Sequence, residues 1–171
     1  MIGRFLSRLR NDRSGMATVE FALLSVMFFG VMMAALDLGM WYQQRLRLDS
    51  AVEQGTMIAF NQRGTLDSAA AAAIGTFVGS AAKLSTNPTV VVGCNGGTNN
   101  CSASNRLSYC VSGSPPNVVY TQTASSVCGD NSLPGYYMTI SVTATSNTVI
   151  VPAAMPGGAM VQTRRAVIRL Q

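Results

Sequence analysis

The sequence of 171 residues contains no histidine, and charged side chains make up only 11% of it, against about 25% in average globular domains. A serine or cysteine nucleophile would lack the imidazole that usually activates it. The only acidic residues beyond position 60 are Asp67 and Asp130, so no carboxylate pair suggests acid–base catalysis. We therefore expect no enzyme, no catalytic residue and no cofactor.

Cysteine is also scarce, and its four residues all lie downstream: Cys94, Cys101, Cys110 and Cys128. None forms a C-x-x-C pair, which argues against a metal site. An even count in a stretch rich in Gly, Asn and Ser favours two disulfides, and therefore an oxidising compartment such as a bacterial periplasm or cell surface. Of the three pairings, Cys94–Cys101 with Cys110–Cys128 is preferred because it closes short loops. Four buried free thiols are the alternative.

The chain has a net charge of +5 that is unevenly distributed. Residues 1–15 hold four arginines against Asp12, a net charge of +3, which leaves +2 for all that follows. No basic run with interleaved aromatic residues occurs downstream. Nucleic-acid binding is therefore not expected.

A long apolar segment follows the arginines. Residues 16–36 are apolar except for Thr18, Glu20, Ser25 and Gly30. A helix of this length spans about 30 Å, the thickness of the hydrocarbon core of a bilayer. Trp41 and Tyr42 suit the membrane–water boundary. Because arginines precede the segment, the N-terminus is predicted to stay in the cytoplasm and the C-terminal bulk to be exported, in agreement with the cysteines.

A cleaved secretory signal peptide is the main alternative for this segment. Val31–Ala34 offers it a weak cleavage site. Glu20 disfavours this interpretation, because a carboxylate at the centre of an apolar helix costs up to about 2.5–3.5 kcal/mol. The helical pattern also continues past Ala35, so we favour a membrane anchor.

The start of the apolar segment carries a specific pattern. Arginines, Gly15, four mainly apolar residues and then Glu20-Phe21 together resemble the prepilin peptidase site of type IV pilins. The resemblance implies cleavage between Gly15 and Met16, so that Met16 becomes the new N-terminus. Glu20 can then neutralise the Met16 amine of a neighbouring subunit, which would fix the register of the subunits. A glutamate that only reaches headgroup water is the simpler alternative.

The helical pattern continues beyond the membrane to Phe60, where Arg45 and Asp49 can meet at a spacing of four residues. A second helix is predicted to begin at a cap formed by Thr65 or Asp67. The predicted apolar stripe of this helix consists of Ile74, Phe77, Val78 and Ala81.

Beyond Pro88 the period changes to two, which predicts a small antiparallel sheet packed on the helices. The fold class is therefore α+β, with a pilin-like long helix. The expected strands are Thr89–Gly93, Leu107–Ser112, Val118–Thr123, Tyr137–Thr145, Val149–Val151 and Met160–Leu170. The predicted parts are a cytoplasmic leader (1–15), a transmembrane helix (16–42), periplasmic helices (43–88) and a β-rich, cysteine-containing exported domain (89–171).

Both ends of the chain are similar to the TadE-like minor pilins, or pseudopilins, of the tight-adherence (Tad, Flp) pilus apparatus. The similarity rests on Gly15–Leu23, on Leu36–Gly39, where the family commonly has Asp-x-Gly, and on an alternating tail that ends at Arg165–Arg169. The cysteine region is not covered. TadE-like and TadF-like relatives are not separated by these features.

The resemblance implies a minor pilin or pseudopilin, processed by a prepilin peptidase, that initiates or tips a type IVb pilus used for surface adherence. Its implied partners are that peptidase, the major Flp-type pilin, other minor pilins, the inner-membrane Tad assembly platform and membrane lipid. The expected location is the bacterial inner membrane, with incorporation into the surface pilus as an option. The alternatives are a membrane-anchored periplasmic binding or adhesion module, and a pseudopilin of a type II secretion-like machine.

Overall fold

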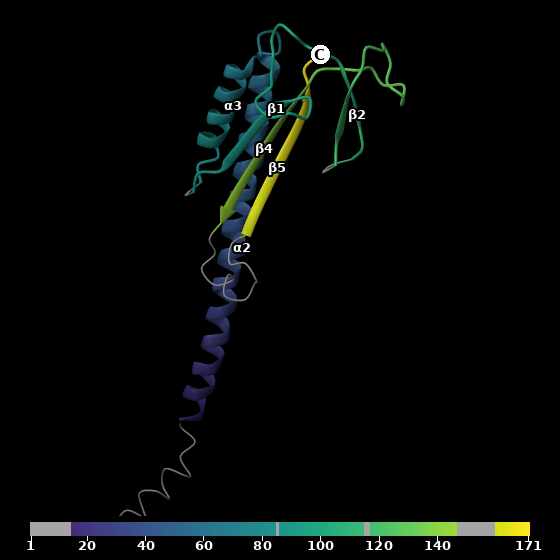
Figure 1. The fold of residues 1–171 in the computed structure, drawn as a ribbon. Coiled ribbons are helices and arrows are strands. Elements are labelled where there is room, and N and C mark those ends of the chain that lie inside the picture. The colour runs from purple at the N-terminus through teal and green to yellow at the C-terminus, as the bar shows by residue number, and fades with distance from the viewer. Residues whose placement is uncertain (1–14, 85, 115–116, 147–159) are drawn as a thin grey trace, which may run out of the picture.

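The α+β prediction is confirmed by the computed structural model, which describes residues 15–84, 86–114, 117–146 and 160–171 (Figure 1). The elements are α2 (Met16–Asn61), α3 (Ser68–Ala81), β1 (Thr89–Cys94), β2 (Tyr109–Ser112), β3 (Val119–Gln122), β4 (Tyr137–Ser146) and β5 (Met160–Arg169). The predicted strand Val149–Val151 lies outside the described residues.

Helix α2 is continuous over 46 residues, a length of roughly 70 Å. Its second half packs against the head, by which we mean α3, the strands and residues 43–61 of α2. The buried positions of this half are Leu48, Ala51, Val52, Gly55 and Ala59. Steps of three and four residues place them on one helix face. Leu46 and Phe60 fall off this face and are about half exposed.

Helix α3 returns beside α2 after a short turn (Figure 1). Of the two predicted caps, Asp67 serves, since its carboxylate accepts the Ala70 N–H at 2.7 Å. Ile74 and Val78 are buried as predicted, but Phe77 is 38% exposed. The prediction is wrong for Phe77 because the buried stripe follows a different set of positions. The fully buried members of α3 and its cap are Ala71, Ile74, Val78 and Ala82.

The two helices approach each other closely at Gly55. A Cβ at this position would collide with the side chain of Val78 and would lie 3.3 Å from Cδ1 of Ile140. Glycine is therefore required where α2 meets both α3 and the sheet.

Strands β1, β4 and β5 form an antiparallel sheet in which β4 is central. The register pairs Ile140 with Val92 on one side and with Ala166 on the other. Met138, Ile140 and Val142 are fully buried, and the sheet lies along the two helices (Figure 1). The predicted alternation of residues in β4 therefore corresponds to side chains that point in turn into the core and to the outer face of the sheet.

Strands β2 and β3 form a separate two-stranded sheet (Figure 1), so the prediction of one sheet is wrong. One reason lies at the outer edge of β1, where the following loop folds back. Asn99 donates its N–H to the Val92 carbonyl at 3.1 Å, and the Cys94 N–H donates to the Asn100 side chain at 2.8 Å. These bonds occupy groups that another strand would need.

The small β2–β3 sheet is held to the rest of the head by few contacts. Tyr109 forms an isolated bridge with Gly135, and the hydroxyls of Tyr120 and Thr139 lie 3.1 Å apart. The structure contains the preferred disulfides, Cys94–Cys101 and Cys110–Cys128. The second one closes the loop that carries β2 and β3.

Candidate membrane anchor and processing site

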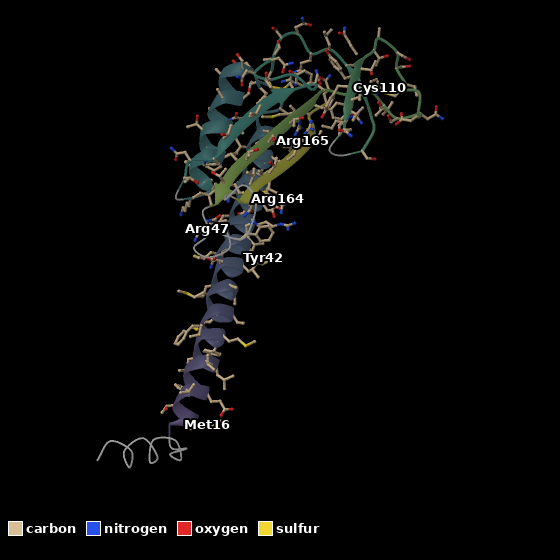
Figure 2. All side chains as sticks on the ribbon, turned by 60° about the horizontal axis from the view of Figure 1, so that its bottom comes forward. Met16, Tyr42, Arg47, Cys110, Arg164 and Arg165 are labelled. Atoms are coloured by element: carbon tan, nitrogen blue, oxygen red, sulfur yellow. A yellow bond between two sulfur atoms is a disulfide. The ribbon has the colours of Figure 1, made fainter. Side chains whose placement is uncertain are left out.

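The N-terminal half of α2 exposes large apolar side chains on all sides. Phe21 is 73% exposed and Val26 is 74% exposed. Within the described ranges, α2 is the one helix long and apolar enough to cross a membrane, and none of its most apolar window is buried. Figure 2 shows this half projecting from the head, with Met16 at its far end. A helix with apolar side chains on every side needs an apolar surrounding, such as lipid or a bundle of similar helices.

Gly15 and Met16 lie at the very start of this exposed helix. Gly15 precedes the first helical residue, and within the described residues no atom beyond its chain neighbours lies within 4 Å of a Cβ built on it. Its carbonyl accepts the Thr18 hydroxyl at 2.6 Å and the Val19 N–H at 3.2 Å. The described residues thus leave the Gly15–Met16 bond uncovered, at a helix end, where helices fray.

Glu20 and Phe21 lie one turn further along α2, and both are exposed. No ion pair of Glu20 is found within the described part of the chain. The Phe21 carbonyl accepts the hydroxyl of Ser25 at 2.7 Å, which satisfies that polar group within the helix. Of the polar side chains in this half, Glu20 is therefore the one left to seek a partner outside its own helix.

The anchor joins the head at a small polar contact. The side-chain N–H of Gln162 donates to the Trp41 carbonyl at 3.3 Å. Gln162 is 7% exposed, and Asp37, one turn before Trp41, is 3% exposed. Gln162 was missed by sequence reasoning, although a polar residue at an inward position of the alternating last strand is a signal that could have revealed it.

A second contact ties β5 to α2. Arg164 Nε lies 2.7 Å from a carboxylate oxygen of Asp49. The sequence suggested that Arg45 could meet Asp49, but the guanidinium of Arg45 lies over the Trp41 ring at 5.8 Å. Asp49 is therefore paired with Arg164 of β5 and not with Arg45 of its own helix.

The cysteine-bearing loops lie at the end of the molecule opposite the anchor, where Figure 2 labels Cys110. In the loop closed by the second disulfide, Asp130 accepts the Ser132 hydroxyl at 2.7 Å and its N–H at 3.0 Å. These two bonds lower the pKa of Asp130. The carboxylate therefore stays charged and holds this turn at neutral pH, and the contribution is lost only as the pH falls through the lowered pKa.

The protein therefore consists of a candidate membrane anchor, which is the projecting apolar helix, and an α+β head with two disulfides. More particularly, residues 15–57 match the family model described as TadE-like protein. The match confirms the resemblance at the N-terminal end and indicates involvement in the Tad pilus system. It ends before the tail, so the similarity of the tail stays a prediction. Comparisons with curated proteins and with solved structures gave no match.

Proposed function

We propose that this protein is a minor pilin or pseudopilin that helps to initiate or tip a Tad-type pilus. The observation that carries the proposal is the exposed apolar helix that begins at Met16, directly after Gly15, inside the TadE-like segment. Pilin-type assembly needs such helices, which leave the bilayer to pack together in a filament. The large head supports a minor rather than a major role, because the major Flp-type pilins implied by the resemblance are much shorter chains.

In this proposal the head is exported and the N-terminus stays in the cytoplasm. Two independent features support this orientation. Four arginines precede the apolar segment, and the head carries two disulfides, which persist in oxidising compartments. The proposed partners are a prepilin peptidase, the major Flp-type pilin, other minor pilins and the inner-membrane assembly platform.

The proposed role is non-catalytic. A cavity of about 510 Å³ lies between α3 and β1, and none of its lining residues has an ionisable side chain. The lining side chains that face it from α3 and β1 are small or aliphatic, such as Gly75, Thr76 and Val90. The sequence also lacks histidine. These features support a structural part in pilus assembly.

The decisive experiment is the mass of the membrane-extracted protein, made with an active or an inactive prepilin peptidase. We expect the active peptidase to yield a chain that begins at Met16. A Gly15→Leu variant should stay uncut, whereas Gly30→Ala, a matched glycine in the same exposed half with nothing within 4 Å, should be cut normally. An intact Met1 would favour an anchored binding or adhesion module, and a cut after Ala34 would favour a secreted one.

A further inference from the structure

Three basic residues lie where α2 leaves the head, and the two on α2, which are two residues apart, face different sides of the helix. Arg45 and Arg47 lie on α2, and Lys83 directly follows the C-terminal cap of α3. A guanidinium N–H of Arg47 donates to the Lys83 carbonyl at 3.2 Å, which brings the two chain segments together. Figure 2 labels Arg47 at the base of the head, one turn of helix above Tyr42. We call Arg45, Arg47 and Lys83 the basal cluster.

Within the described parts of the chain, no recorded ion pair joins the basal cluster to an acidic group. Asp49 is engaged by Arg164 at 2.7 Å, and Asp37 is 3% exposed. Arg47 and Lys83 are both exposed. The end of the head that faces the anchor therefore presents positive charge to its surroundings.

The cluster lies at the height of the lipid headgroups when the anchor spans a bilayer. Exposed large apolar side chains follow one another closely along α2 as far as Met40, which is 45% exposed, and only Tyr42 and Leu46 follow them before the buried positions of the second half of α2 begin. Arg45 and Arg47 follow by five and seven residues, about 7–11 Å along the helix, and a headgroup layer is roughly 5–7 Å deep. Helical side chains tilt toward the N-terminus, here toward the membrane. Long arginine side chains can therefore reach the phosphates.

We propose that the basal cluster docks the head onto the phosphate groups of anionic lipids in the leaflet that surrounds the anchor. The surface is continuous with the apolar helix, so the same membrane that receives α2 meets the cluster. Anionic headgroups complement its charge. Docking would hold the head against the bilayer. The inference requires the membrane anchor, but not the role in a pilus.

Trp41 is the sole tryptophan of the chain and lies beside the cluster, under Arg45, so its fluorescence reports on docking. The full chain is reconstituted in phosphatidylcholine vesicles with or without phosphatidylglycerol, and quenching by the neutral molecule acrylamide is measured. We expect anionic lipid to reduce the quenching by roughly twofold at low salt, and high salt to abolish the difference.

The variant Arg47→Gln with Lys83→Asn should lose this effect of anionic lipid. Asparagine suits position 83 because Lys83 has a φ of 46°, a conformation that asparagine tolerates well. The matched control is Arg63→Gln, since Arg63 follows α2 at the opposite end of the head; it should behave as the natural chain does. Circular dichroism and non-reducing gels check that each variant is folded.

Three outcomes would overturn the proposal. Equal quenching in neutral and anionic vesicles would exclude anionic lipid as the partner of the cluster and would favour an acidic protein surface. Equal loss in the Arg63 control would mean that net charge alone is sensed. Shielding of Trp41 by inorganic phosphate in neutral vesicles would assign the site to free phosphate instead of lipid.

Discussion

Among single residues, Glu20 is the ionisable side chain within the apolar segment 16–36. It is exposed on the candidate membrane anchor, and in a bilayer an unpaired carboxylate would cost up to about 2.5–3.5 kcal/mol at the centre. Its place one turn after Met16 would let it meet the amine that the proposed processing would create on a neighbouring subunit. The cost of burying each charge is then offset by the other.

We expect Glu20→Ala to be processed after Gly15 but to enter pili poorly. A lost contact worth about 1.4 kcal/mol corresponds to a tenfold fall in incorporation. The measurement is the mass of the membrane form together with the amount of protein in the sheared pilus fraction. Glu53→Ala, which removes an exposed glutamate from the head half of α2, is the control and should assemble normally. Normal piliation of the Glu20 variant would exclude the register role.

Among the elements, α2 combines two environments in one continuous helix. Its first half exposes apolar side chains, and its second half buries a single stripe against α3, β4 and β5. The most restrictive point of that stripe is Gly55, because the opposing Val78 is fully buried and β-branched, with a stiff side chain.

We expect Gly55→Ala to destabilise the head. Overpacking costs about 1–3 kcal/mol, whereas the gain in helix propensity is only about 0.8–1.0 kcal/mol, so the collision should dominate. Thermal unfolding followed by circular dichroism in detergent should show a lower midpoint. Gly39→Ala, in the same helix with nothing within 4 Å, should leave the midpoint unchanged or raise it. Identical melting of both variants would contradict the close packing at Gly55.

For the whole molecule, the two disulfides differ in what they hold. Cys94–Cys101 closes 7 residues and Cys110–Cys128 closes 18. Loop length alone favours the second by only about 0.8 kcal/mol. Cys94, however, is fully buried at the end of β1, within the main core, whereas Cys110 belongs to the separate β2–β3 sheet.

We therefore expect the double variant Cys94→Ala with Cys101→Ala to lower the unfolding midpoint of the entire head. Cys110→Ala with Cys128→Ala should release mainly β2 and β3. Hydrogen exchange distinguishes these results, since the second variant should lose protection in Tyr109–Gln122 and keep it in β4. Loss of protection throughout the head in both variants would show that the small sheet and the main core unfold as one unit.

Much of the fold could be predicted because local patterns determine it. The run from Met16 to Leu36 is apolar at nearly every position, so no arrangement of the rest of the head could bury it all. The alternation of β4 likewise follows from the two faces of a sheet. The TadE-like resemblance rests partly on Gly15–Leu23 and Leu36–Gly39, two short contiguous stretches that lie within the matched segment 15–57.

Other features depend on residues that are distant in sequence, so only the tertiary structure decided them. Asp49 pairs with Arg164, not with Arg45, because β5 brings the closer guanidinium. The β2–β3 sheet is separate from the three-stranded sheet. One reason is that the loop after β1 occupies part of the outer edge of β1. The basal cluster exists because α3 ends beside Arg47. The sequence by itself determined the projecting apolar helix, since side chains apolar on every side do not depend on folding. The contact of Arg47 with the Lys83 carbonyl required the fold, because residues 36 positions apart meet only when the helices pack.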